Sequence, residues 1–293
     1  MSLQHEILII TRPIQKIVRE IGVKLGLINP NRLRVLLYHD IPLSQEDNLS
    51  NQLGWLKRNW NFVTPLEFEK MISGEIPIIG NNLLVTFDDG MLSNLAAAEK
   101  ILNPLGIKAI FFVITEFIKI KEHLEARQFA SDYLIPGSKI NDIPEHWRNL
   151  QWSHLSDLIK QGHTIGHHTK MHTRLSHCRS GNELEEEIII SANEIEHNLN
   201  IEIKHFAYTF GDIDSFSKEA LSVAKSQFSF VYSGLRGSNS KHTSPLAIRR
   251  DAAASQFPNE YKIFNNKLLD AFLDGFADFR YKSSIRKLDS WTN

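Results

Sequence analysis

Two adjacent aspartates stand directly after an apolar segment of the sequence. Residues 83–87 read LLVTF, and Asp88, Asp89 and Gly90 follow them. Burying two carboxylates at the end of a strand is unfavourable unless positive charge lies beside them. A cation is therefore expected next to this pair, with its other ligands elsewhere in the chain.

The segment 162–177, GHTIGHHTKMHTRLSH, holds the candidate ligands. His168 and His172 are four residues apart, a spacing at which two imidazoles can converge on one ion. Because the chain has 13 histidines, this spacing alone indicates little. Two histidines and one carboxylate, however, form a three-ligand set with an open position, which is typical of catalytic zinc. The second carboxylate could then accept a proton from the bound water.

The elements that would position these residues alternate between strand and helix. Apolar runs predict strands at 33–38, 83–87, 107–114, 163–166 and 204–210. Helical spacing predicts helices at 48–60, 66–74, 91–106, 153–162, 181–200 and 217–227. The alternation predicts an α/β fold with a parallel sheet, open or closed into a barrel, and 115–150 is expected to be a long loop.

Four of the predicted strands end at or just before a residue that could do chemistry. These residues are His39, Asp88, His168 and Phe210. In parallel α/β folds the carboxyl ends of the strands meet on a common rim, where functional groups gather. We therefore expect the four to lie close together, although capping or core packing could explain each one alone.

The two ends of the chain are predicted to be helical. Within the first 34 residues, six basic and two acidic residues accompany an apolar stripe at helical spacing, made of Ile10, Ile14, Ile17, Ile21 and Leu25. Two interpretations stay open: a helix that packs on the main domain, or a basic amphipathic helix that rests on an anionic membrane. The segment 265–279 reads as an amphipathic helix.

Composition narrows the class of protein. The formal net charge of −1 gives no indication of nucleic-acid binding, and a single cysteine, Cys178, allows no internal disulfide. No apolar run approaches the roughly 18 residues that span a bilayer, and the first residues do not read as a secretory signal. The expected location is the cytoplasm, including the inner face of the membrane as a peripheral protein.

Several motifs resemble those of a known family in order and spacing. TFDDG (86–90), HTKMH (168–172) and FAYTFG (206–211) are similar to the motifs of the polysaccharide deacetylases, carbohydrate esterase family 4 or NodB-homology domain. VLLYHDI (35–41) resembles the Tyr-His-x-Ile segment of the branch that includes poly-N-acetylglucosamine deacetylases. The resemblance covers about residues 34–250 and implies a distorted (β/α) barrel, commonly of seven parallel strands.

The expected organisation follows from this resemblance. We expect an N-terminal amphipathic basic helix at 1–33, a NodB-like catalytic domain at 34–255 and a C-terminal helical extension at 256–293.

The resemblance also implies roles for individual residues. It makes Asp88 the catalytic base, and Asp89, His168 and His172 the ligands of one divalent metal ion, with Zn²⁺ preferred. The backbone N–H near Phe210 would help to hold the oxyanion. His39 is the candidate general acid, because a late Leu-x-His motif, which supplies this acid in most members, is not found here.

Other positions are expected to support these groups. Thr169 matches the Ser/Thr between the family's ligand histidines. Ala207 and Thr209 depart from the third motif, which often has Arg and Pro there. Arg249 or Arg250, together with Asp251, is therefore expected to orient the base or the acid instead.

The implied activity is metal-dependent hydrolysis of the acetamido group of an N-acetylhexosamine, with release of acetate. The partner would be an N-acetylated sugar, oligosaccharide, glycolipid or cell-envelope intermediate, with peripheral membrane contact through residues 10–27. Two alternatives stay open: hydrolysis of a non-sugar amide or imide, or a catalytically silent sugar-binding module.

Overall fold

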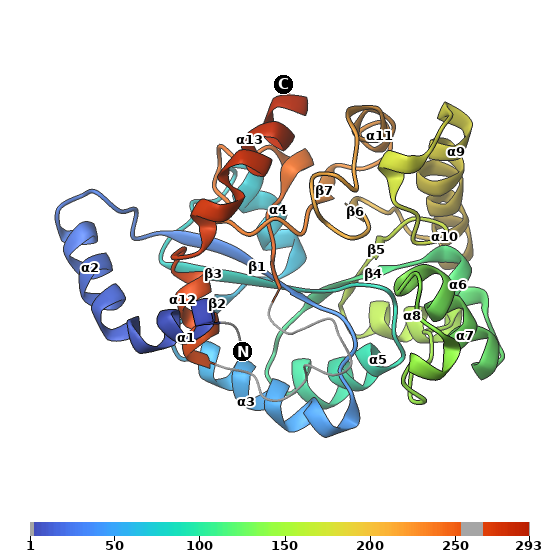
Figure 1. The fold of residues 1–293 in the computed structure, drawn as a ribbon, viewed down its shortest axis with the longest axis horizontal. Coiled ribbons are helices and arrows are strands. Elements are labelled where there is room, and N and C mark those ends of the chain that lie inside the picture. The colour runs from blue at the N-terminus through green and yellow to red at the C-terminus, as the bar shows by residue number, and fades with distance from the viewer. Residues whose placement is uncertain (1–2, 253–265, 293) are drawn as a thin grey trace.

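The computed structural model describes residues 3–252 and 266–292, and within them a curled sheet of parallel strands is surrounded by helices (Figure 1). The strand order is β7-β6-β5-β4-β3-β1-β8, and β2 pairs with β3 off this path. The strands are β1 (Arg32–Tyr38), β2 (Asn61–Phe62), β3 (Asn81–Phe87), β4 (Ala109–Val113), β5 (Thr164–His167), β6 (His205–Ala207), β7 (Phe230–Tyr232) and β8 (Asp251–Ala252). The expected distorted barrel of seven parallel strands is thereby confirmed.

Residues 248–252 connect the two ends of this strand order. Ile248 forms a parallel bridge to Tyr232 of β7. Asp251 and Ala252 pair with Leu36 and Leu37 of β1. Arg250, the residue before β8, is therefore held inside the curl of the sheet, close to the end of β3.

The central strands form because both of their faces are buried. β1, β3 and β4 are near-continuous apolar runs, as is usual for parallel strands covered on both sides. Leu36, Val85 and Phe111 lie in the larger core cluster. Val35 and Leu84, which point the other way, lie in a second cluster. This burial fixes the register, so that β1 and β3 end at the same level.

Helices fill the connections between strands. Their bounds are α1 (Leu3–Ile10), α2 (Arg12–Lys24), α3 (Glu46–Leu56), α4 (Pro65–Ser73), α5 (Ser93–Ala97), α6 (Thr115–Lys119), α7 (His123–Phe129), α8 (Trp152–Lys160), α9 (Gly181–Glu185), α10 (Ser191–Leu199), α11 (Lys218–Ala224), α12 (Asn266–Leu273) and α13 (Lys282–Trp291). π-helical turns continue α5 and α7 and join α9 to α10.

The segment 115–150 departs from its prediction. It was expected to be a loop, but it contains α6, α7 and a π-helical turn at Ala130–Leu134. Phe117 and Phe129 stack at 5.0 Å between ring centroids and bury this segment as a small separate cluster. Its helices are short, so no long amphipathic period marks them in the sequence.

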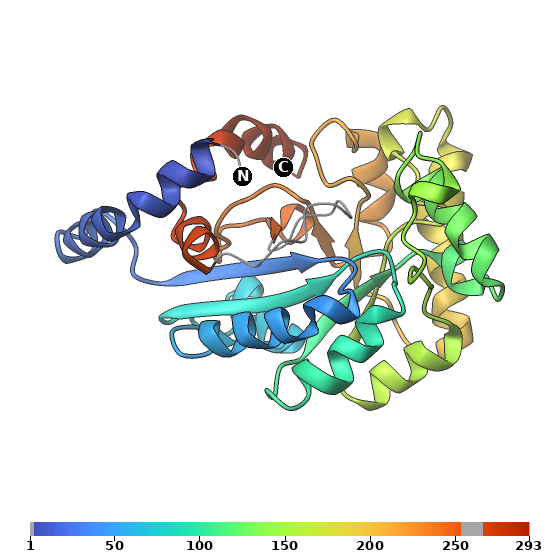
Figure 2. The same cartoon turned by 60° about the horizontal axis from the view of Figure 1, so that its bottom comes forward.

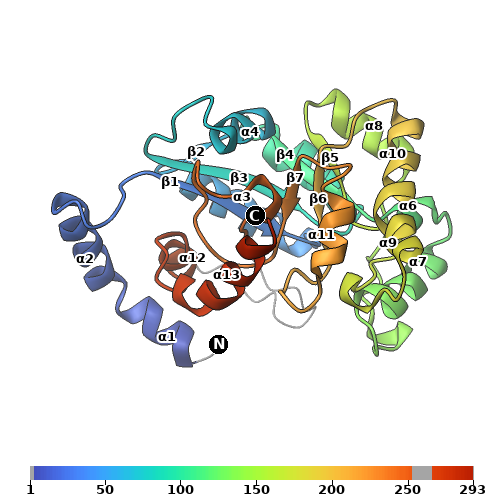
Figure 3. The same cartoon turned by 90° about the horizontal axis from the view of Figure 1, so that it is seen from above.

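The N-terminal segment forms two helices that meet at Thr11, and they lie beside α12 (Figures 2 and 3). The contact is polar: Arg12 of α2 donates hydrogen bonds to Asp270 and Asp274. The apolar stripe faces outward instead, and its five side chains are 52–77% exposed. The basic face of α2 therefore docks on the body, and the apolar face does not.

The expected domain boundaries can be compared with the bounds of the described strands and helices. β1 begins at Arg32, two residues before the expected start of the catalytic domain at position 34. The expected boundary at 255/256 lies outside the described residues. The predicted tail helix at 265–279 corresponds to α12, which ends at Leu273, followed by a short 3₁₀ turn at Asp278–Tyr281.

Candidate metal and catalytic site

Asp89, His168 and His172 come together at the carboxyl ends of β3 and β5. One ligand atom from each of the three lies within 4.8 Å of the others, and all three side chains are buried. The Nε2 atom of His168 is 3.5 Å from Asp89 Oδ1, and that of His172 is 3.6 Å from the same oxygen. The structure thus groups the three residues expected to hold a metal.

The two imidazoles are oriented by backbone carbonyls. His168 Nδ1 lies 2.6 Å from the carbonyl oxygen of Ala207, and His172 Nδ1 lies 2.8 Å from that of Tyr133. A carbonyl oxygen can only accept, so each Nδ1 carries a proton, and each Nε2, which lies close to Asp89, is the nitrogen left to bind a metal. Such outer contacts fix the tautomer and orientation of histidines that bind metals.

A divalent cation fits the chemistry of this set. Asp89 Oδ1 is buried without a hydrogen-bond partner among the described residues. Burial favours the neutral carboxyl, but the interactions with His168 and the other nearby histidines outweigh it and hold the pKa of Asp89 well below its usual range. Burial lowers the pKa of His172 to about 4, so that this imidazole is neutral at pH 7, as a metal ligand must be.

Asp88 is compensated by a different cation, the guanidinium of Arg250. The two side chains form a bidentate pair, with Nη1 donating to Oδ1 at 2.6 Å and Nη2 donating to Oδ2 at 2.8 Å. Both are almost fully buried, and Arg250 Nε also donates to the carbonyl of Ser233 at 2.8 Å. A guanidinium therefore fixes Asp88 even though Ala207 stands where the family motif often has arginine.

The other two candidates for orienting the base lie elsewhere. Arg249 donates to Asp289 at 2.8 Å and to Thr243 at 2.9 Å, away from the pocket. Asp251 accepts from Arg34 and Arg236 inside the barrel. Neither contacts Asp88 or His39, so Arg250 alone of the three has the expected contact.

His39 lies at the end of β1 and lines the same pocket as the metal-ligand set. It is half-buried, and no hydrogen bond of its imidazole is found within the described part of the chain. Its neighbour Asp40 does not orient it, because Asp40 binds Ser93, His146 and Trp147. No contact within residues 3–252 and 266–292 therefore keeps the imidazole from a ligand in the pocket.

The pocket between these groups has a volume of about 330 Å³. Met91, Leu134 and Trp147 give it apolar walls beside the charged residues. At its mouth the ring of Phe210 lies 4.7 Å from that of His172 and is covered by the guanidinium of Arg174 at 4.5 Å. The Phe210 N–H has no hydrogen-bond acceptor among the described residues.

Left-handed backbone conformations are concentrated at this site. Of the five non-glycine residues with positive φ in the described ranges, four belong to it: Asp89 (φ 73°), Thr169 (65°), His172 (60°) and Phe210 (61°). Side chains are held in this region at a cost of about 1–3 kcal/mol each, and such strain clusters at functional sites. Gly90 (φ 79°) completes the turn, where a Cβ would lie 3.2 Å from Val113.

Some of these features could not be expected from the sequence. Thr169 was expected to support the ligand histidines, but its hydroxyl is buried without a partner in the described structure, and its carbonyl accepts from Thr115 N–H. Tyr133 contributes only a carbonyl group, which no side-chain motif can reveal.

Comparison with known proteins agrees with this architecture. A family model described as "Polysaccharide deacetylase" matches residues 79–228, a range that includes Asp88, Asp89, His168 and His172. The protein "Putative polysaccharide deacetylase YxkH" of Bacillus subtilis (strain 168) is 30% identical over 105 residues, which are 34% of this chain and 38% of that protein. The match therefore spans well under half of this relative's length.

Solved structures show the same fold at low sequence identity. IcaB from Ammonifex degensii is 24% identical with a TM-score of 0.61, over 84% of this chain and 98% of that one. The Streptococcus pyogenes deacetylase PplD, in complex with acetate, is 20% identical with a TM-score of 0.63, over 84% and 99%. The deacetylase domain of BpsB from Bordetella bronchiseptica is 17% identical with a TM-score of 0.59, over 77% and 98%.

The family match extends over 150 of the 293 residues, from just before β3 to just after α11. It confirms the resemblance and the hydrolase class expected from the three motifs. The chain belongs to the polysaccharide deacetylase family.

Proposed function

We propose that this protein is a metal-dependent N-deacetylase that hydrolyses the acetamido group of an N-acetylhexosamine in a glycan, glycolipid or cell-envelope intermediate. One observation carries the proposal: the buried group of Asp89, His168 and His172 lies beside a second carboxylate, Asp88, that is held by an arginine and stays outside that group. A family member without activity would need neither this three-residue group nor the paired Asp88 beside it.

The metal is held by Asp89, His168 and His172, and we propose Zn²⁺ because imidazole and carboxylate ligands in a three-residue set suit it. When bound, the ion supplies Lewis-acid polarisation of a carbonyl group and lowers the pKa of water.

Asp88 is the general base in this proposal. Its two oxygens are fixed by Arg250, so the carboxylate cannot rotate away from the pocket. Each carboxylate oxygen has two lone pairs, and the one not used by the guanidinium can take the proton of the attacking water. The oxygen of that water then forms a bond to the acetyl carbon.

His39 and Phe210 act on the other atoms of the amide. The Phe210 N–H, which is free among the described residues, donates to the oxygen that becomes negative as the carbonyl is attacked. His39 donates a proton to the nitrogen as the carbon–nitrogen bond breaks, so that the sugar leaves as a neutral amine. Acetate is the second product.

The size of the pocket supports a small sugar unit as the reacting group. Its volume of about 330 Å³ lies at the lower end of the range of about 300–1,000 Å³ for small-molecule sites. Acetate release from N-acetylated oligosaccharides tests the assignment directly. A metal-loaded protein that binds these oligosaccharides but releases no acetate would instead be a sugar-binding module.

The metal assignment predicts the behaviour of a histidine variant. His172→Ala removes one of three ligands, so the folded variant should lose most of its metal on dialysis, as measured by elemental analysis. His177→Ala, which changes an exposed histidine of the neighbouring turn, is the matched control and should keep its metal. Equal metal content in the two variants would contradict the ligand set.

The base assignment predicts separate effects on turnover and on metal. Asp88→Asn removes the proton acceptor, so turnover per folded molecule should fall by roughly 10²–10⁴-fold. Metal content should stay that of the unchanged protein. Because Arg250 loses its buried counter-charge, the variant should also unfold at a lower temperature. Loss of metal together with activity would make Asp88 a ligand instead.

The general-acid assignment predicts that His39→Ala keeps fold and metal but loses turnover. The alkaline limb of the pH–rate profile should change as well, because that limb reports the group that must be protonated. A histidine with only a packing role would lower the melting temperature and leave turnover per folded molecule intact. In that case the proton comes from another residue.

We also propose peripheral contact with a membrane through residues 10–27. Within the described ranges no helix is long and apolar enough to span a bilayer. The apolar stripe supports surface contact, because its side chains are exposed from the end of α1 to the residue after α2, and Ile7, Val18 and Leu27 extend it. Since Arg12, Lys16 and Arg19 are paired with Asp270 or Asp274, the contact would depend on apolar burial more than on general attraction to anionic lipid.

A double variant tests this contact. Ile14→Ser/Ile17→Ser should weaken binding to phosphatidylcholine vesicles by at least about tenfold, because burial of an isoleucine is worth about 1.5–3 kcal/mol. Adding phosphatidylglycerol should change binding of the unchanged protein little. Ile79→Ser is the control, since Ile79 is 72% exposed on another part of the surface. Vesicle binding that is equal in all three proteins would exclude the proposed contact.

A further inference from the structure

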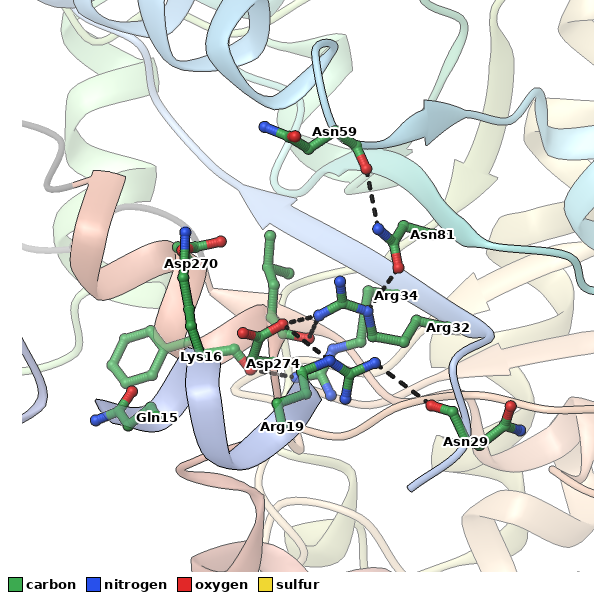
Figure 4. A network of polar contacts seen from close by, with 12 residues as sticks. Gln15, Lys16, Arg19, Asn29, Arg32, Arg34, Asn59, Asn81, Asp270 and Asp274 are labelled. Atoms are coloured by element: carbon green, nitrogen blue, oxygen red, sulfur yellow. Dashed lines mark hydrogen bonds and ion pairs between the residues drawn. The ribbon is translucent and has the colours of Figure 1, made fainter. Parts of the chain in front are cut away.

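A second charged cavity lies where α2, the start of β1 and the end of α12 meet. Its volume is about 460 Å³. Five basic and three acidic side chains line it, which leaves a net charge of +2: Arg12, Lys16, Arg19, Lys24 and Arg32 against Glu20, Asp270 and Asp274. We call this cavity the α2 crevice, and Figure 4 shows the polar contacts among the side chains that line it.

The aspartates of the α2 crevice are shared among several cations. Asp274 is hydrogen-bonded to Arg12 and Arg32, and Arg19 Nε lies 3.6 Å from it. Asp270 accepts from Arg12 Nε at 2.8 Å and lies 3.0 Å from Lys16 Nζ. Because each carboxylate carries one negative charge, these pairs do not neutralise the arginines.

Arg19 has hydrogen-bond donors that no acceptor among the described residues occupies. Apart from its long contact with Asp274, its recorded hydrogen bond is from Nη2 to the carbonyl of Asn29 at 3.4 Å. A guanidinium offers five donors, so most of these remain available to a ligand. Burial and the charge of Arg12 lower the pKa of Arg19, and burial with the charge of Arg19 lowers that of Arg32 to about 9. An added anion would relieve this repulsion.

The α2 crevice is distinct from the deacetylase pocket. Arg32 is the first residue of β1, whereas His39 follows the last. Seven strand residues separate the two sites by about 20 Å. A molecule bound in the crevice would not reach Asp88 or Asp89.

We propose that the α2 crevice binds a phosphoryl group. A phosphate dianion matches the excess of two positive charges, whereas a carboxylate would offset only one. Arginine forks bind phosphate oxygens in pairs, with strong charge-assisted hydrogen bonds. The ring of Trp60, over which Arg32 lies at 4.4 Å, and the half-buried Trp55 form an apolar wall beside the charges. The group is carried either by a soluble phosphate compound or by a phospholipid.

Titration calorimetry with inorganic phosphate, at constant ionic strength and on the full chain, tests the proposal. We expect saturable binding that Arg19→Gln weakens by about tenfold or more, the equivalent of one charge-assisted hydrogen bond. Arg58→Gln changes an exposed arginine that does not line the crevice, and it should leave binding unchanged. If the phosphate were bound near Asp89 instead, neither substitution would weaken its affinity, and this result would contradict the proposal.

A vesicle experiment distinguishes the two sources of phosphate. Phosphatidylcholine vesicles with and without phosphatidic acid are compared for the unchanged protein and the two variants. If Arg19→Gln weakens the binding of inorganic phosphate, the ligand is a soluble phosphate compound. If Arg19→Gln weakens only the binding of vesicles that contain phosphatidic acid, the ligand is a phospholipid. No binding in either experiment, or equal weakening by Arg58→Gln, would overturn the proposal. Acetate release by Arg19→Gln should be unchanged, so the outcome does not depend on the proposed deacetylase activity.

Discussion

The need to compensate two adjacent buried carboxylates governs the arrangement of this protein. Asp88 and Asp89 end β3 at a depth where neither can stay ionised alone, and each meets a different source of positive charge. Asp88 is paired with Arg250, and Asp89 faces His168 and His172. These partners come from the loop after β5 and from the segment before β8, so the sheet must curl before either carboxylate is satisfied.

The sequence predicts much of this arrangement. Apolar runs such as AIFFV have the continuous character of strands buried on both faces, and strands of that kind lie parallel with their functional ends together. The grouping of Asp89, His168 and His172 follows from this rule, because all three come after strand ends. The rule does not predict the hydrogen bonds that orient the two histidines. Their acceptors are the backbone carbonyls of Ala207 and Tyr133, which no side-chain motif can reveal.

Neighbouring arginines show where sequence reasoning stops. Arg249 and Arg250 are equal candidates by position, yet one bonds Asp289 on the outside and the other bonds Asp88 within the barrel. Successive residues of an extended chain point to opposite sides, so only the register of the strand decides between them. The N-terminal helix is similar: periodicity identified its apolar face, but Asp270 and Asp274 determine that the opposite face docks.

The pairing of α2 with α12 also sets an order of events during synthesis. Arg12 and Asp270 are 258 residues apart, so at about 5–20 residues per second the arginine waits roughly 10–50 s for its partner to be made. The strands β3 to β7, which pair within residues 81–232, are made before Asp270, by roughly 2–8 s at this rate. Helix α2 therefore docks only after these strands have been made, and until then its arginines lack their aspartate partners.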